Sequence, residues 1–109
     1  MMEARQSRSW CFSLEFDADK AARNGCDLET LYDSVGRKVE PYGLTRTSQN
    51  TWNAKPGDEV SSQCLALSML SKTKWVMRNI RSLTVWEDDA EGFDGLEVIR
   101  RTNPERLAP

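Results

Sequence analysis

The sequence predicts one α+β domain, in which an antiparallel sheet carries two helices on one of its faces. Two observations carry this prediction: segments in which apolar side chains alternate, as in strands, and segments with apolar residues at helical spacing. These segments follow one another in the order strand, helix, strand, strand, helix, strand. The chain of 109 residues has room for one domain of ordinary size.

The composition describes a globular protein and excludes several kinds of chemistry. Hydrophobic residues make up 39% of the chain and charged residues 29%, and we expect neither a membrane span nor a signal peptide. The absence of histidine excludes histidine-dependent zinc sites and catalytic triads. The irregular spacing of Cys11, Cys26 and Cys64 fits free thiols in a reducing cytoplasm. With a net charge of −2, a nucleic-acid partner would need a local basic patch.

The first strand is expected from Ser9 to Asp17, because its large apolar residues share one face: Trp10, Phe12, Leu14 and Phe16. The next segment, from Ala18 to Cys26, is polar and contains Asn24-Gly25, so we expect a loop there. A helix should then run from about Leu28 to Glu40, with Asp27 as its N-cap and Leu28, Leu31, Tyr32, Val35 and Val39 as its apolar stripe.

The middle of the chain predicts a hairpin and a second helix. The Thr-rich segment from Leu44 to Asn53 is expected to turn near Ser48-Gln49-Asn50. Asp58 then caps a helix from Glu59 to Ser71, whose expected stripe is Val60, Cys64, Leu67 and Leu70 or Ser71. A helical turn around Lys74–Met77 follows.

The last core strand is expected from Ile80 to Glu87, with Leu83 and Val85 pointing inward. An acidic, turn-prone run from Asp88 to Gly92 comes next, and Leu96–Ile99 predicts a small strand or helical turn. This order of elements is that of the split βαβ, or ferredoxin-like, fold. We expect residues 1–8 to form a flexible N-terminus, 9–101 the domain and 102–109 a tail. An exposed Trp86 on the uncovered sheet face suggests self-association.

Several segments, taken together, resemble the virulence-associated protein D family of small toxin-like endoribonucleases. Glu15-Phe16-Asp17 is similar to the family's first strand, which closes on Phe-Asp, and Leu31-Tyr32-Asp33 with Tyr42-Gly43-Leu44 matches its helix and the Gly-Phe step that follows. Thr47–Trp52 resembles a Thr-Gln-Gly-Ser-x-aromatic stretch. The strongest match combines Leu70–Trp75, Arg78–Arg81 and Val85–Asp88, so the resemblance covers roughly residues 10–99.

The resemblance implies a ferredoxin-like fold, a homodimer and hydrolytic cleavage of RNA, with an antitoxin protein as a possible partner. The fold of small CRISPR-associated nucleases is similar, and their first-strand Asp lies near the dimer axis. Two features depart from the family pattern. Ala18 stands where a Leu usually follows Phe-Asp, and Gln49 is displaced by one position in a stretch that lacks the glycine.

Asp17 is the candidate catalytic residue, because it ends the first strand and could meet its own copy in a symmetric dimer. Such a carboxylate could take the proton from a ribose 2′-hydroxyl, which needs no cofactor, or bind a divalent cation such as Mg²⁺. It could also simply cap the next turn. Glu15 and Asp19 are neighbours that could help to bind a metal or could be merely solvated.

A basic cluster surrounds Trp75 and is the candidate RNA-binding site, with Lys72, Lys74, Arg78 and Arg81 as its cations. Arginine matches phosphate geometry and tryptophan offers a stacking surface for a base. The alternative is a structural role, in which the cations complement a helix C-terminus while Trp75 fills the edge of the core. Arg46, in the polar hairpin, is a further possible phosphate contact.

Two other functions stay open at this point. A non-enzymatic binding module, such as a phage or plasmid regulator or inhibitor, would use the open sheet face, and the altered stretch around Gln49 favours it. A purely structural dimerisation domain would need only Trp86.

Overall fold

The computed structural model describes residues 10–87 and 91–107. Its strands are β1 (Cys11–Phe16), β2 (Thr45–Ser48), β3 (Thr51–Asn53), β4 (Ile80–Trp86) and β5 (Phe93–Asp94). Its helices are α1 (Ala18–Arg23), α2 (Leu28–Val39), α3 (Glu59–Ser71), α4 (Lys74–Asn79) and α5 (Gly95–Thr102). Two short 3-10 helices, η1 (Glu40–Tyr42) and η2 (Pro104–Leu107), follow α2 and α5. The expected acidic run at 88–90 and the expected N-terminal segment 1–8 lie outside the described residues.

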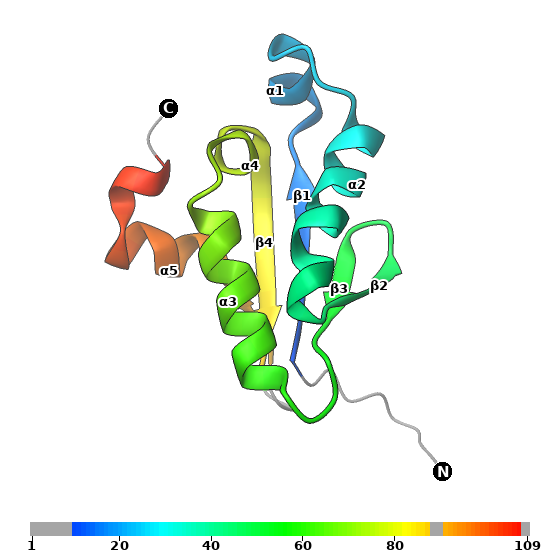
Figure 1. The fold of residues 1–109 in the computed structure, drawn as a ribbon. Coiled ribbons are helices and arrows are strands. Elements are labelled where there is room, and N and C mark those ends of the chain that lie inside the picture. Colours follow the sequence, from blue (N-terminus) through cyan, green and yellow to red (C-terminus); the bar gives the residue numbers. More distant parts are fainter. Residues whose placement is uncertain (1–9, 88–90, 108–109) are drawn as a thin grey trace.

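Within the described residues, the strands form one antiparallel sheet in the order β2-β3-β1-β4-β5. Helices α2 and α3 lie next to each other over one face of this sheet (Figure 1). The predicted α+β class with an antiparallel sheet is confirmed, and the arrangement is compatible with a ferredoxin-like fold. No helix in residues 10–87 and 91–107 has the length and apolar character needed to cross a membrane.

The central strand β1 forms as its alternating pattern predicts. Phe12, Leu14 and Phe16 are buried beneath the helices, whereas Glu15 is exposed on the other face. Burying each large apolar side chain contributes about 1.5–3 kcal/mol, which fixes this strand in the middle of the sheet. The register between β1 and β4 shifts at Glu15/Phe16, so Arg81 is an extra residue in β4.

The segment from Ala18 to Cys26, which we expected to be a loop, begins with helix α1 instead. Asp17 starts the helix, because its Oδ1 accepts a hydrogen bond from the backbone N–H of Lys20 at 3.0 Å. Three alanines within α1 favour helical geometry strongly. The helix is followed by Gly25, whose φ of +71° suits glycine. The expectation was therefore wrong because the Asn-Gly signal marks only the end of the segment.

Helix α2 agrees with its prediction, from the Asp27 cap to the buried stripe. The Tyr32 hydroxyl on this stripe accepts a hydrogen bond from the backbone N–H of Phe16 at 3.0 Å. Helix α2 therefore holds the end of β1, the point at which Asp17 leaves the sheet.

Helix α3 has the expected bounds and buries only part of the expected stripe. Val60 is 57% exposed and Cys64 is exposed, whereas Ser62, Gln63, Ala66 and Leu70 are buried. The Gln63 amide donates hydrogen bonds to the backbone carbonyls of Trp86 at 2.9 Å and Cys11 at 3.4 Å. The stripe prediction is confirmed for Leu70 and Ser71, which are buried, and for Leu67, which packs against the core. It was wrong for Val60 and Cys64, because the first half of the buried face uses small residues and a hydrogen-bonded glutamine.

The C-terminal residues extend the core beyond the expected elements. Leu96–Ile99 lies in helix α5, whose Ile99 is buried, and Leu107 of η2 packs against the core. Helix η2 (Pro104–Leu107) lies in the segment 102–109 that we expected to be a tail. In Figure 1, α5 lies beside α3 at the β4 edge of the molecule.

Trp86 is half-buried rather than exposed, which corrects the expectation for the open sheet face. A Cβ atom on Gly92 would lie 2.7 Å from the indole, so this glycine packs against the ring. The ring therefore packs within the chain, and the homodimer stays a prediction that rests on the family resemblance.

Candidate nucleic-acid interface

A basic pocket of about 470 Å³ lies where the end of α3, helix α4 and η2 meet. The positively charged residues that line it are Lys72, Lys74, Arg78 and Arg106. We call this feature the basic pocket. Glu105 is its one acidic lining residue, and Ser71 and Met77 complete the wall.

Helix α4 brings two of the predicted RNA-binding residues together. Val76 and Met77 are buried and anchor the helix on the core, while Lys74 and Arg78 are exposed. Residues four positions apart lie on the same helix face, so these two cations form a pair. Lys74 and Arg78 thus line one pocket, and their role in RNA binding stays a prediction.

Two lining residues of the basic pocket, Glu105 and Arg106, were not predicted from the sequence. Arg106 Nη1 donates a hydrogen bond to Ser71 Oγ at 2.7 Å, across 35 positions of the chain. No local pattern indicates this contact, because it depends on how η2 packs on α4. The one available signal is Leu107, an apolar residue in an otherwise polar segment.

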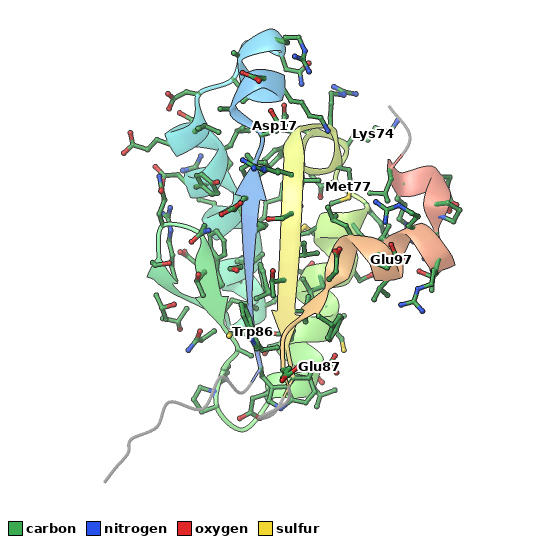
Figure 2. All side chains as sticks on the ribbon, turned by 180° about the vertical axis from the view of Figure 1, so that it is seen from behind. Asp17, Lys74, Met77, Trp86, Glu87 and Glu97 are labelled. Carbon is green, nitrogen blue, oxygen red and sulfur yellow. The ribbon has the colours of Figure 1, made fainter. Side chains whose placement is uncertain are left out.

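Asp17 lies at the same end of the molecule as the basic pocket. Its backbone N–H donates to the carbonyl of Asn79, the residue after Arg78, at 2.8 Å. Figure 2 shows Asp17, Lys74 and Met77 at one end of the sheet and Trp86 at the other. The backbone of Asp17 is thus joined to the end of α4, while its carboxylate contacts the backbone of Lys20.

The Asp17 carboxylate is stabilised in its ionised form. The hydrogen bond from the backbone N–H of Lys20 lowers the pKa of Asp17, and the backbone of Asp19 and the charges of Lys20 and Arg23 act in the same direction. Asp17 therefore stays negatively charged at neutral pH. A carboxylate with a lowered pKa binds cations readily but is a weak general base.

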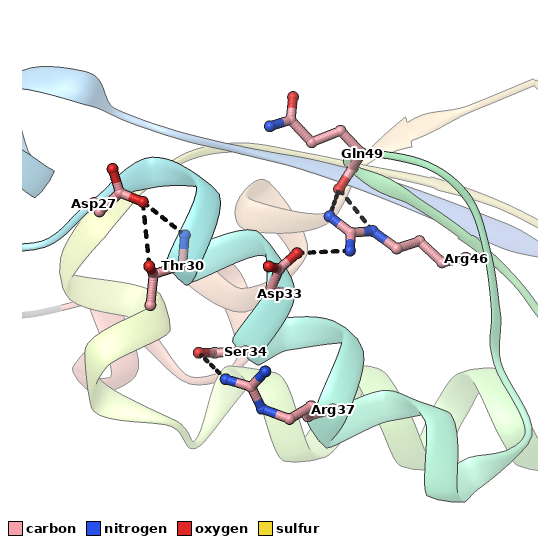
Figure 3. A network of polar contacts seen from close by, with 7 residues as sticks. All are labelled: Asp27, Thr30, Asp33, Ser34, Arg37, Arg46 and Gln49. Atoms are coloured by element: carbon pink, nitrogen blue, oxygen red, sulfur yellow. Dashed lines mark hydrogen bonds and ion pairs between the residues drawn. The ribbon is translucent and has the colours of Figure 1, made fainter.

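Arg46 lies apart from the basic pocket, on β2 at the opposite edge of the sheet. Its guanidinium forms an ion pair with Asp33 at 2.8 Å and donates to the carbonyl of Gln49 at 2.8 and 3.2 Å (Figure 3). It also lies over the Trp52 ring, 5.6 Å from the ring centroid. Arg46 therefore fastens the hairpin to α2.

Trp75 and Arg81 are separated from Lys74 and Arg78. Trp75 is half-buried, with its ring 6.3 Å from that of Phe16, so it packs on the edge of the core. Arg81 lines a second hollow of about 390 Å³ beside β4 and β5, together with Arg100. The predicted cluster therefore divides between two surfaces.

The acidic neighbours of Asp17 point to no ready metal centre. Asp19 lies in the first turn of α1, and Glu15 accepts a hydrogen bond from Ser82 Oγ at 3.4 Å. In the part of the chain that the structure describes, no three Cys, Asp or Glu residues are grouped so as to hold a metal ion.

Comparison with known proteins adds no family to this picture. No family model matches the chain, and no curated protein matches it significantly.

Proposed function

We propose that this chain is a small endoribonuclease with a ferredoxin-like fold, which cleaves single-stranded RNA as a homodimer. The observation that supports the proposal is the hydrogen bond between the backbone of Asp17 and that of Asn79, because it joins the backbone of the candidate catalytic residue to the end of the basic helix α4. The strand order and antiparallel pairing support the ferredoxin-like topology, with β5 and α5 as additions.

In the proposed reaction, the cations of α4 hold the RNA backbone and stabilise the negative charge that develops on the attacked phosphate. Asp17 accepts the proton of the neighbouring ribose 2′-hydroxyl, and the oxygen of that hydroxyl attacks the phosphorus. The bond from phosphorus to the 5′-oxygen of the next nucleotide breaks, which leaves a 2′,3′-cyclic phosphate on one fragment. The departing 5′-oxygen takes a proton from water and becomes the 5′-hydroxyl of the other fragment, and Asp17 then releases its proton to water. The lowered pKa makes Asp17 a weaker proton acceptor than an ordinary carboxylate. Slow, selective cleavage suits a toxin-like enzyme whose partner would be an antitoxin.

A divalent cation would need more oxygen ligands than Asp17 alone supplies. The described residues around Asp17 do not form such a set, so we assign no step to a metal ion.

A second candidate function is a non-enzymatic RNA-binding module. It is favoured by the capping role of Asp17, since the bond to the backbone of Lys20 explains the presence of this carboxylate without catalysis. The basic pocket would then bind RNA and leave it intact.

The variant Asp17→Asn separates the two functions, because asparagine also caps helices but cannot take a proton. We expect this variant to keep the fold and RNA binding while cleavage falls by about 100-fold or more. Asp27→Asn is the matched control, since Asp27 caps α2 in the same way through the backbone of Thr30. Cleavage of labelled single-stranded RNA should be followed with and without magnesium, and the oligomeric state by light scattering. Wild-type protein that binds the RNA and leaves it whole in both conditions would establish the binding module instead.

A further inference from the structure

Arg106 is held in the basic pocket by a hydrogen bond to Ser71. Ser71, its partner, is buried in the last turn of α3, and the Ser71 hydroxyl donates a hydrogen bond to the carbonyl of Ser68 at 2.8 Å. With its proton committed to this bond, the hydroxyl oxygen accepts from Arg106 at 2.7 Å. The guanidinium is thereby fixed in the pocket wall next to the end of α3.

Most of the hydrogen-bonding capacity of Arg106 remains unused. A guanidinium has five N–H donors, and the bond to Ser71 is the one hydrogen bond of this side chain within the described residues. No ion pair within residues 10–87 and 91–107 involves Lys72, Lys74, Arg78 or Arg106. Four cations therefore share one pocket with a single carboxylate, that of Glu105, and with no ion pair to balance them.

Helix stability does not account for this gathering of charge. Lys72 follows α3 and Arg78 lies in the last turn of α4, where positive charge is favourable. Lys74 begins α4, where positive charge is unfavourable, and Arg106 lies in neither helix. A bound anion would offset the mutual repulsion of these side chains.

We propose that the basic pocket is a phosphate-binding site that the C-terminal turn η2 completes, with Arg106 as its anchored ligand. Phosphate is the favoured anion because its oxygens match the arginine fork and its charge can engage several cations. The inference rests on the proposed function for the source of the phosphate, which is the RNA backbone. A free phosphate or nucleotide has the same chemistry and is distinguished by the test.

The test compares four variants of the full chain. Arg106→Gln removes the anchored cation, Ser71→Ala removes its anchor, and Glu105→Gln removes the negative charge. Arg37→Gln is the matched control, because Arg37 donates to a serine hydroxyl in the same way, to Ser34 at 3.1 Å, but on α2. Circular dichroism and thermal unfolding verify that each variant is folded.

Binding of labelled single-stranded RNA should weaken about tenfold in Arg106→Gln, with a salt slope shallower by about one. We expect a smaller loss in Ser71→Ala, a gain in Glu105→Gln and no change in Arg37→Gln. In the second arm, inorganic phosphate should shift the NMR amide signals of Ser71 and Lys72 in wild-type protein and not in Arg106→Gln.

Each outcome decides a different part of the inference. Equal RNA binding by Arg106→Gln, Arg37→Gln and wild type overturns the pocket while leaving the proposed RNA binding intact. Phosphate shifts that depend on Arg106, in a protein that binds no RNA, support the pocket and reject RNA as its source. Amide signals that phosphate leaves unmoved, together with no RNA binding, overturn both.

Discussion

Asp17 shows how one side chain can carry a structural role beside a proposed catalytic one. Its carboxylate fixes the first turn of α1, and its backbone joins β1 to the end of α4. The sequence indicated both roles, as strand-end acid and as cap, but could not rank them, because the spacing is the same for either. The structure assigns the capping contact directly.

The capping role of Asp17 predicts a pH dependence of stability. Because the folded-state pKa of Asp17 is lowered, its contribution is present above the pKa of the unfolded chain and is lost as the pH falls through the folded-state value. Wild-type protein should therefore unfold at a higher temperature than Asp17→Asn at neutral pH. The difference should shrink and vanish in acid. Thermal unfolding of both proteins across this pH range checks the prediction, because the two chains differ only at Asp17. A difference that stays constant with pH would contradict the assignment.

At the scale of elements, the attachment of α5 to the sheet depends on a close approach at Gly95. A Cβ atom there would lie 2.6 Å from Leu83 Cδ2 and 3.1 Å from Val85 Cγ2. Leu83 and Val85 are themselves buried, so neither can move aside freely.

We expect Gly95→Ala to lower the free energy of unfolding by about 1–3 kcal/mol, because the added methyl overpacks this contact. Denaturant unfolding measures the loss, with Gly57→Ala as a contrasting variant in open space at a φ of +90°, where strain alone acts. RNA binding should fall as well, because η2 follows α5 and carries Arg106. A variant of wild-type stability would mean that α5 is loosely attached.

The elements also show where sequence patterns succeed. The strand β1 and helix α2 follow from their apolar periodicity, because their buried faces are made of large apolar side chains. Part of the buried face of α3 could not be predicted in this way. Its packing uses Ser62, Gln63 and Ala66, and periodicity gives a polar residue no reason to be inside. Helix α1 was missed because capping and alanine content, rather than an apolar stripe, specify it.

For the molecule as a whole, the local charge around the basic pocket has the opposite sign to the net charge of the chain. The chain carries a net charge of −2, yet one end gathers four cations around the basic pocket. A local patch of this kind is what a nucleic-acid partner of an acidic protein requires. The sequence predicted the cations of α4 as part of this patch. The contribution of Arg106 from η2, and the position of Arg46 at the far edge of the sheet, depend on the fold.

This distribution predicts how RNA binding responds to salt. If three or four cations contact phosphates, the logarithm of the affinity should fall against the logarithm of the salt concentration with a slope of about −2 to −3. Titrations of labelled RNA at several salt concentrations measure this slope. A slope near zero would show that stacking or open-face contacts dominate.

The Gln63 amide has a consequence for the layers of the molecule. The buried face of α3 contains three small side chains, Ser62, Ala66 and Ser71, beside Leu70 and Gln63. The amide donates to two strand carbonyls, and a helix shifted by one turn would lose both of these hydrogen bonds. Gln63 thus favours the observed position of α3 on the sheet and, through it, the position at which α4 begins.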